Sequence, residues 1–312
     1  MAIEVAGARY EGAVDLKGGR RLGFAEFGPA HGEPIIWFHG TPGARRQIPP
    51  LAHAAIDALG LRIISIERPG IGLSTSHQYR AVVDIADDVT QVVDALGIDD
   101  FGVVGLSGGG PYALATGARL GDRVYGVAVL GGVVPTAGDE ACAAGPVLGL
   151  ARRFTGLMPA MVGVGGVGLW ALVKATGPAQ NQLYATYSRL MPVGDREVFA
   201  TPGMREMFIG DIRQGARHQF RAVLHDAILF GRDWGFRLGD MSVPVRWWHG
   251  DADPIVPLAA AEMAAGFIPD IEFKVRPGES HLGGFAAAEE VLTALDELRP
   301  VSRPVPIHSL TE

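Results

Sequence analysis

The stretch FGVVGLSGGGPYALA, residues 101–115, sets a single serine among glycines at the junction of two elements. The apolar run before Ser107 is typical of a buried strand, and the segment after it is typical of a helix. A sharp strand-to-helix turn forces its central residue toward positive φ and leaves no room for side chains two residues to either side. Gly105 and Gly109 meet that steric demand. The sequence therefore predicts a strained, exposed serine, which is a candidate nucleophile.

Strand-like apolar runs surround this junction in two blocks of the chain. Helix-patterned stretches separate the later strands, and a final helix is expected from about Phe285 to Leu298. Alternating strands and helices are typical of a mostly parallel sheet with helices on both faces, here with roughly eight strands. The expected strands are 10–16, 21–28, 34–40, 61–70, 101–109, 124–132, 243–251 and 271–278.

Residues 136–240 interrupt this rhythm. They show no clear strand pattern and are rich first in Ala, Gly and Met, then in aromatic and charged residues. We expect a core of residues 1–135 and 241–312, with 136–240 inserted after the sixth strand as a helical cap. Within the cap, residues 154–173 carry no charge over a length that would span a bilayer. Pro159 and several glycines lower its helix propensity, so we expect a buried or pocket-lining segment, with contact at a lipid surface or a membrane span as the alternatives.

Composition and charge exclude several classes of protein. The net charge is −7 and no run of Lys or Arg forms a basic stripe, so nucleic acid is not an expected partner. The single cysteine, Cys142, excludes an internal disulfide and is expected to be buried, and no Cys/His spacing indicates a zinc site. The N-terminal residues contain no continuous apolar run of the kind found in a signal peptide, which favours a cytoplasmic location.

A serine hydroxyl is a poor nucleophile unless a base accepts its proton and hydrogen-bond donors stabilise the oxyanion. The stretch FHGTPG, residues 38–43, directly follows a predicted strand. Its loop can aim the backbone N–H of Thr41 into the same cleft as the N–H of Gly108, forming a two-donor oxyanion hole. We expect His39 and Gly40 to support this loop, His39 as a brace and not as a proton carrier.

Two further stretches follow the last two predicted strands and offer an acid and a base. HGDADPIVP, residues 249–257, contains Asp251 and Asp253, and PGESHLGG, residues 277–284, contains His281 in a loop. The order Ser, Asp, His along the chain is one of the known orders of a catalytic triad.

With these motifs the chain resembles the α/β-hydrolases. The family's nucleophile elbow, G-x-S-x-G, matches residues 105–109, and its oxyanion loop, His-Gly-x-Pro, matches residues 39–42. The acid motif G-x-x-D-x-x-x-P matches residues 250–257, which favours Asp253 over Asp251, although Asp251 stays open as the acid. The resemblance covers about residues 1–135 and 241–300 in order, and it implies a triad of Ser107, Asp253 and His281.

The chain departs from the family's usual pattern in two places. Glu67, in ERPGIGLS, stands where aspartate is commoner, and Ser280 stands where glycine usually precedes the histidine. Other candidates have simpler interpretations. His249 is expected to be a structural hydrogen bonder, and Asp139 is a less favoured alternative for the acid. We expect His218 and His225 on a solvated face of the cap, with a pocket-lining role as the alternative.

The resemblance also narrows the expected reaction. A serine nucleophile argues against the family's haloalkane dehalogenases and epoxide hydrolases, which use aspartate, and Gly108 argues against its proline iminopeptidases, which usually carry tryptophan there. Hydrolysis of an ester, thioester or lactone of a small to medium hydrophobic substrate is expected, without a metal or organic cofactor. C–C hydrolysis and a perhydrolase or haloperoxidase-like reaction are alternatives, and a ligand receptor with slow or absent turnover is the alternative from another class. Leu169 and Trp170 are expected to line the acyl pocket, and the sequence leaves a homodimer open.

Overall fold

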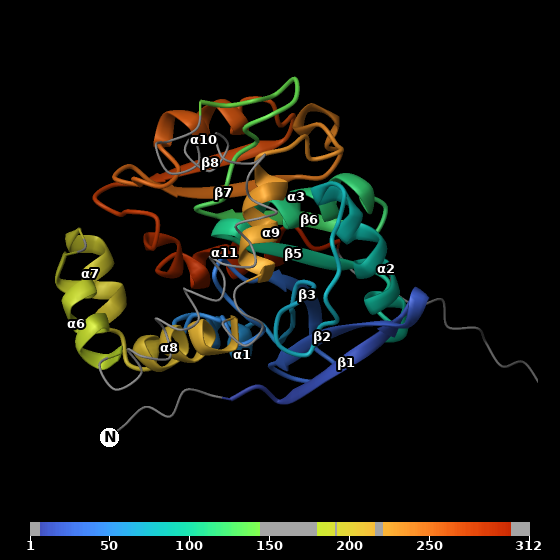
Figure 1. Cartoon of the computed structure of the whole chain (residues 1–312), viewed down its shortest axis with the longest axis horizontal. Helices are drawn as coiled ribbons and strands as arrows, with labels where there is room; N and C mark the ends of the chain where they lie inside the picture. The colour runs from blue at the N-terminus through green and yellow to red at the C-terminus, as the bar shows by residue number, and fades with distance from the viewer. Residues whose placement is uncertain (1–6, 144–179, 191, 216–220, 301–312) are drawn as a thin grey trace, which may run out of the picture.

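The computed structural model describes residues 7–143, 180–190, 192–215 and 221–300, and its centre is an eight-stranded sheet (Figure 1). The strand order is β1-β2-β4-β3-β5-β6-β7-β8. β2 runs antiparallel to both of its neighbours, and every pairing from β4 to β8 is parallel, which confirms the predicted sheet. The strands are β1 (Tyr10–Leu16), β2 (Arg20–Phe27), β3 (Glu33–Phe38), β4 (Leu61–Ile66), β5 (Phe101–Leu106), β6 (Val124–Leu130), β7 (Val245–Gly250) and β8 (Ile271–Arg276).

Helices cover both faces of the sheet, as predicted (Figure 1). Because successive side chains of a strand point to opposite faces, β3 sends Ile36 and Phe38 into one buried layer and Ile35 and Trp37 into the other. The first layer contains α2 (Ile85–Ala95), α3 (Gly110–Arg119) and α10 (Leu258–Ala265), and the second contains α1 (Ala52–Ala58) and α11 (Ala288–Glu297).

The apolar residues of α2 recur at helical spacing, and this spacing determines how the helix packs. Ala86, Val89 and Val93 are fully buried against the sheet, whereas Asp87 and Asp94 face solvent. An apolar stripe at this spacing forms one face of an α-helix, so the amphipathic pattern accounts for both the helix and its orientation.

The described chain between β6 and β7 is helical and contains no strand. It comprises α6 (Gln180–Leu190), α7 (Val193–Ala200), α8 (Met204–Gly215) and α9 (Arg221–Phe230). The segment's own aromatic contacts join Tyr184, Phe199 and Phe208. In Figure 1, α6 and α7 lie at one side of the sheet and α9 lies near α3. The division into core and cap stays a prediction, and residues 154–173, with Leu169 and Trp170, lie outside the described residues.

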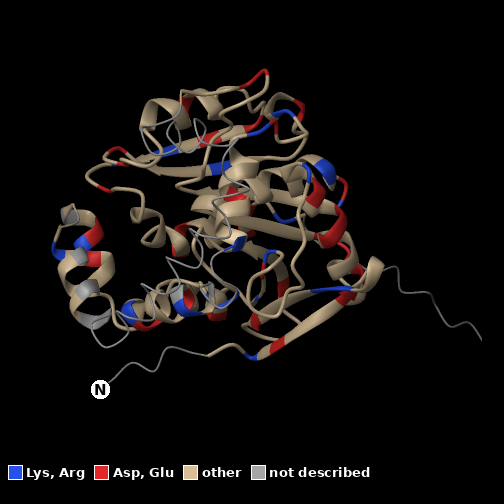
Figure 2. Cartoon of the chain, viewed as in Figure 1, with Lys and Arg blue, Asp and Glu red and all other residues tan. Residues whose placement is uncertain are grey.

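Charged residues of both signs are interspersed over the described chain in the view of Figure 2. Within the described ranges, no helix combines the length and apolar character that crossing a membrane requires. Cys142 is buried, as expected.

Candidate active site

Ser107 occupies a strained turn between β5 and α3. Its φ is 52°, and among the described residues it is the one non-glycine residue with positive φ. A Cβ atom at Gly105 would lie 2.6 Å from the carbonyl oxygen of Gly109, and one at Gly109 would lie 2.2 Å from that of Phe38. Any side chain at either glycine would therefore clash with backbone. The close approach inferred from the sequence holds on both sides of the serine.

Ser107, His281 and Asp253 form a continuous chain of hydrogen-bonded side chains. Ser107 Oγ lies 2.6 Å from His281 Nε2, and His281 Nδ1 lies 2.7 Å from Asp253 Oδ2. With Nδ1–H donated to the carboxylate, Nε2 is left as the acceptor for the serine hydroxyl. The three residues follow β5, β8 and β7, so the carboxyl ends of parallel strands bring them to one edge of the sheet.

The Asp253 carboxylate is buried and held in its charged form. Its Oδ1 accepts hydrogen bonds from the backbone N–H groups of Ile255 at 2.8 Å and Val256 at 2.9 Å. Burial by itself raises the pKa of this carboxyl, but the hydrogen bond and charge of His281, with the N–H of Val256, hold the pKa below its ordinary value. A carboxylate that stays ionised can orient a neighbouring imidazole and stabilise its protonated form.

The alternative acids lie elsewhere. Asp251 is exposed, and its Oδ1 accepts the backbone N–H of Gly278 at 2.8 Å, so it caps the loop that carries His281. Asp139 is exposed and forms an ion pair with Arg237. Of the three acids considered from the sequence, the structure brings Asp253 to the histidine.

His249 behaves as the structural hydrogen bonder expected from the sequence. Its Nε2 lies 2.8 Å from the carbonyl oxygen of Val256 and 3.4 Å from Asp253 Oδ2. Burial lowers the pKa of this imidazole, so a neutral ring that donates from Nε2 fits the site. His249 thus lies against Asp253, on the acid side of the site.

The oxyanion loop after β3 lies directly against the elbow. A Cβ atom at Gly108 would lie 2.3 Å from Thr41 Oγ1, and one at Gly40 would lie 3.5 Å from Ser107 Cβ. The structure therefore brings together Thr41 and Gly108, the two residues whose N–H groups were expected to face the oxyanion. The lack of a side chain at Gly108 allows this approach.

Hydrogen bonds within the loop fix its backbone. Gln47 Oε1 accepts the N–H of Gly40 at 2.6 Å, and His39 Nδ1 lies 2.8 Å from the Gly40 carbonyl oxygen. Burial and the neighbouring Arg68 guanidinium hold the pKa of His39 well below its usual range. His39 is therefore a neutral imidazole that contacts the loop backbone, and its role as a brace stays a prediction.

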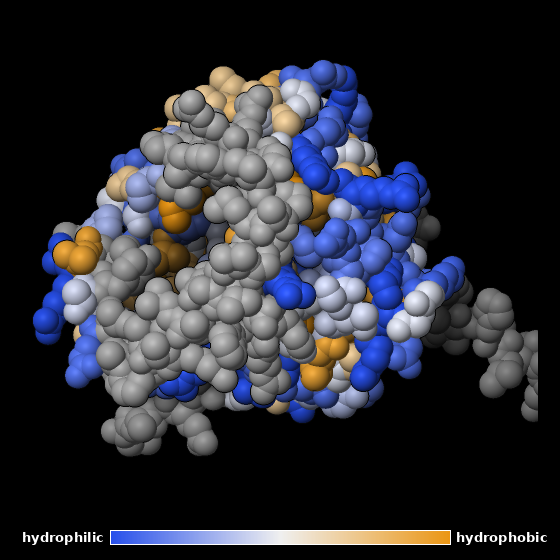
Figure 3. All heavy atoms as spheres, in the orientation of Figure 1, coloured by the Kyte–Doolittle hydropathy of each residue, from blue (hydrophilic) through white to orange (hydrophobic). Residues whose placement is uncertain are grey.

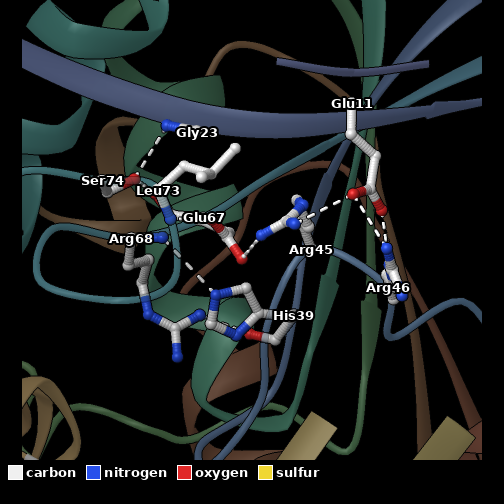
Figure 4. A network of polar contacts seen from close by, with 9 residues as sticks. All are labelled: Glu11, Gly23, His39, Arg45, Arg46, Glu67, Arg68, Leu73 and Ser74. Atoms are coloured by element: carbon white, nitrogen blue, oxygen red, sulfur yellow. Dashed lines mark hydrogen bonds and ion pairs between the residues drawn. The ribbon is translucent and has the colours of Figure 1, made fainter. Parts of the chain in front are cut away.

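Glu67 and Arg68, consecutive residues after β4, contact Arg45, shortly after the oxyanion loop, and the loop itself, as Figure 4 shows. The buried Glu67 carboxylate accepts a hydrogen bond from Arg45 at 2.6 Å and another from the N–H of Leu73 at 2.7 Å. The Arg68 guanidinium donates to the carbonyl oxygens of His39 and Gly40. Glu67, which stands where the family usually has aspartate, thus binds Arg45, a residue beyond the oxyanion loop. Arg68 binds the first residues of the loop itself.

A cavity of about 180 Å³ adjoins this network, and α9 forms part of its wall. His225, expected on a solvated face, is partly buried and lines the cavity, with its Nε2 2.9 Å from Gln78 Nε2. Burial lowers the pKa of this histidine. The alternative pocket-lining position therefore applies to His225, and His218 lies outside the described residues. No group of three or more His, Cys, Asp or Glu side chains suited to a metal ion occurs within the ranges that the structure describes.

Several polar residues that hold the site were not identified from the sequence, namely Gln47, Arg68, Asp195 and Asp226. Gln47 lies seven residues after its partner Gly40, whereas the partners of the other three are far away in the sequence, so no local pattern identifies those three. One signal was available for Asp195. Ser280, the departure from the usual glycine before His281, donates its hydroxyl to that aspartate.

Comparison with known proteins places this geometry among related chains. The sequence model of the alpha/beta hydrolase fold family matches residues 33–156. A non-heme haloperoxidase from Rhodococcus erythropolis is 28% identical over 275 residues, covering 86% of this chain and 92% of that protein. A bromoperoxidase from Bacillus anthracis superposes with a TM-score of 0.67 at 19% identity, covering 92% of this chain and 100% of that one. A thermophilic esterase from Thermogutta terrifontis superposes with a TM-score of 0.62 at 21% identity, covering 92% and 97%.

Residues 33–156 thus match the alpha/beta hydrolase fold family, and the chain shares its fold with the solved structures named above. The structural likenesses show the fold, since many different reactions occur on this scaffold. The reaction and its substrate must therefore be inferred from the geometry of the candidate site.

Proposed function

We propose that this protein is a serine hydrolase that cleaves a carboxylic ester, or a thioester or lactone, through an acyl-enzyme. The observation that carries the proposal is the pair of short contacts from Ser107 Oγ to His281 Nε2, 2.6 Å, and from His281 Nδ1 to Asp253 Oδ2, 2.7 Å. A serine activated in this way needs no metal or organic cofactor to attack a carbonyl carbon.

In the proposed reaction Ser107 Oγ attacks the carbonyl carbon while His281 Nε2 accepts the hydroxyl proton. Asp253 keeps the imidazole in the correct tautomer and stabilises its protonated form. The N–H groups of Thr41 and Gly108 hold the oxyanion, where charge develops in the transition state. His281 then protonates the leaving alcohol, and water, activated by the same imidazole, releases the acid from the acyl-enzyme.

We further propose a substrate with a hydrophobic acyl or alcohol part. Hydrophobic residues are visible between hydrophilic ones on the face shown in Figure 3, and Ala222, Ile228 and Leu229 line the cavity beside Arg68, which supports apolar contacts for the substrate. Each methylene buried in such a pocket contributes up to about 0.8 kcal/mol. Activity on p-nitrophenyl esters should therefore rise as the acyl chain lengthens from two carbons, until the pocket is full, and then fall.

A second candidate reaction uses the same acyl-enzyme. Hydrogen peroxide, in place of water, would attack the acyl carbon, releasing a peracid and regenerating the serine hydroxyl. The haloperoxidase that matches 86% of this chain favours this alternative. The peracid would oxidise bromide in a separate step.

The test combines labelling with turnover. An organophosphonate should label the protein once, at Ser107, as mass spectrometry of the digested protein would show, while graded p-nitrophenyl esters measure hydrolysis. Addition of peroxide, a carboxylic acid and bromide measures the second reaction. Labelling at another serine would refute the assignment of the nucleophile. Labelling at Ser107 without turnover in either assay would favour a ligand receptor.

A further inference from the structure

A buried aspartate on α7 holds the loop that carries His281. Asp195 Oδ1 accepts the backbone N–H of Ser280 at 3.0 Å, and its Oδ2 accepts the Ser280 hydroxyl. The aspartate is fully buried. The start of α7 approaches the loop so closely that a Cβ atom at Gly194 would lie 3.2 Å from the carbonyl oxygen of Gly278. The residue next to His281 is therefore attached to α7 through both its backbone and its side chain.

A second buried aspartate, on α9, holds the oxyanion loop. Asp226 Oδ2 accepts the hydroxyl of Thr41 at 2.9 Å and Nε of Arg68 at 3.0 Å. Its Oδ1 accepts the hydroxyl of Tyr112, on α3, at 2.7 Å. Arg68 also donates to the carbonyl oxygens of the residues before Thr41, so one carboxylate joins α9, α3 and the loop.

The two aspartates share an arrangement that packing alone does not require. Burying a carboxylate costs free energy unless hydrogen bonds compensate for its lost hydration. Apolar side chains would pack α7 and α9 against the core without that cost. Both carboxylates instead contact a residue of the reaction machinery or its immediate neighbour: Thr41 in one case and Ser280, before His281, in the other.

We propose that Asp195 and Asp226 are positioning residues, through which the segment between β6 and β7 holds the base loop and the oxyanion loop in register with Ser107. The inference rests on the proposed serine mechanism. Hydrogen-bond donors and proton acceptors are effective only when they are held in place before the reaction, and an error of about 1 Å costs about 10²-fold in rate. The insertion would thus act on the chemical step as well as on substrate binding.

The test compares Asp195→Asn and Asp226→Asn with two matched controls, Glu197→Gln and Asp233→Asn. Glu197 is exposed two residues further along α7, and Asp233 is exposed shortly after α9. The primary measurement is the rate of phosphonylation of Ser107, which requires an activated serine and a formed oxyanion hole but no particular ester. Steady-state kcat and KM on a p-nitrophenyl ester are measured beside it, with thermal unfolding to identify the folded variants.

We expect each aspartate variant to lose about 10- to 100-fold in phosphonylation rate and in kcat, with KM within about twofold of wild type. The controls should keep the wild-type values. If an aspartate variant does not fold, Ser280→Ala and Tyr112→Phe remove one donor each and should lower the phosphonylation rate by about 3- to 10-fold.

Two results would overturn the positioning role while leaving the proposed function intact. One is wild-type phosphonylation and kcat in a folded aspartate variant. The other is a change confined to KM, which would indicate a contact with substrate. A wild-type protein that no organophosphonate labels would refute the proposed function, and this inference with it.

Discussion

The turn at Ser107 and the loop at His281 are built in different ways. The serine is held by backbone, because Gly105 and Gly109 let strand β5, helix α3 and the end of β3 approach without side chains between them. In the histidine loop a backbone hydrogen bond from the Ala252 N–H to the Glu279 carbonyl oxygen is joined by two side chains, with Asp251 capping Gly278 and Asp195 binding Ser280. A backbone turn is specified by its own few residues, whereas a loop held by side chains depends on residues from other parts of the chain.

The largest expected effect is on the chemistry at the turn. Ser107→Ala should fold normally and lose about 10⁴-fold or more in kcat, because no other group replaces the nucleophile. Ester turnover with thermal unfolding measures both quantities. If the variant kept more than a small part of its activity, some residue other than Ser107 would have to attack the substrate, and the role given to the turn would be wrong.

The next effect separates the two acids near the histidine loop. Asp253→Asn should lower kcat by about 10³-fold, because the amide favours the wrong tautomer of His281. Asp251→Asn removes only the negative charge of a loop cap and should cost less than tenfold. Equal losses in the two variants would move the acid's role to Asp251 or divide it between them.

A third prediction tests the backbone character of the turn. Gly105→Ala places a methyl group 2.6 Å from the Gly109 carbonyl oxygen and should lower the free energy of unfolding by about 3 kcal/mol. The matched control is Gly210→Ala in the exposed part of α8, where an added Cβ would meet nothing within 4 Å apart from its chain neighbours and the backbone of its own helix, and alanine should stabilise by up to about 1 kcal/mol. Urea unfolding measures both. Equal and small effects would show that the turn has room to relax.

The smallest expected effect concerns the ion pairs that Glu11 forms with Arg45 and Arg46, shortly after the oxyanion loop. Hydrogen bonding from Arg46, with Arg45, lowers the pKa of Glu11 from 4.5 to about 2 despite partial burial. Since the unfolded chain then binds more protons between these values, the stabilisation is present above pH 4.5 and is lost as the pH falls toward 2. Glu11→Gln should cost about 1 kcal/mol at pH 7, because the pair is partly exposed and screened. The difference from wild type should shrink near pH 3, and a constant difference would contradict the assignment.

Much of the fold could be predicted from the sequence because its signals are local. The apolar runs of the eight strands, the helical spacing of Ala86, Val89 and Val93, and the glycines around Ser107 all act within a few residues. Strands β5, β7 and β8 also belong to the parallel part of the sheet, whose carboxyl ends meet at one edge, and the motifs that follow these strands predicted that Ser107, Asp253 and His281 would lie together.

Other features depended on the tertiary structure. The sequence showed that Glu67 and Ser280 were departures from a pattern, but only the fold shows that Glu67 reaches Arg45 and that Ser280 meets Asp195. These partners are brought together by the packing of separate elements, and a side-chain hydrogen bond over such a separation leaves no periodic trace in the sequence. The sequence by itself therefore determined the strands and the strained turn at Ser107, because short-range sterics and apolar spacing specify them. The tertiary structure decided which buried carboxylates hold the surrounding loops, because their free energy of burial depends on partners that only folding supplies.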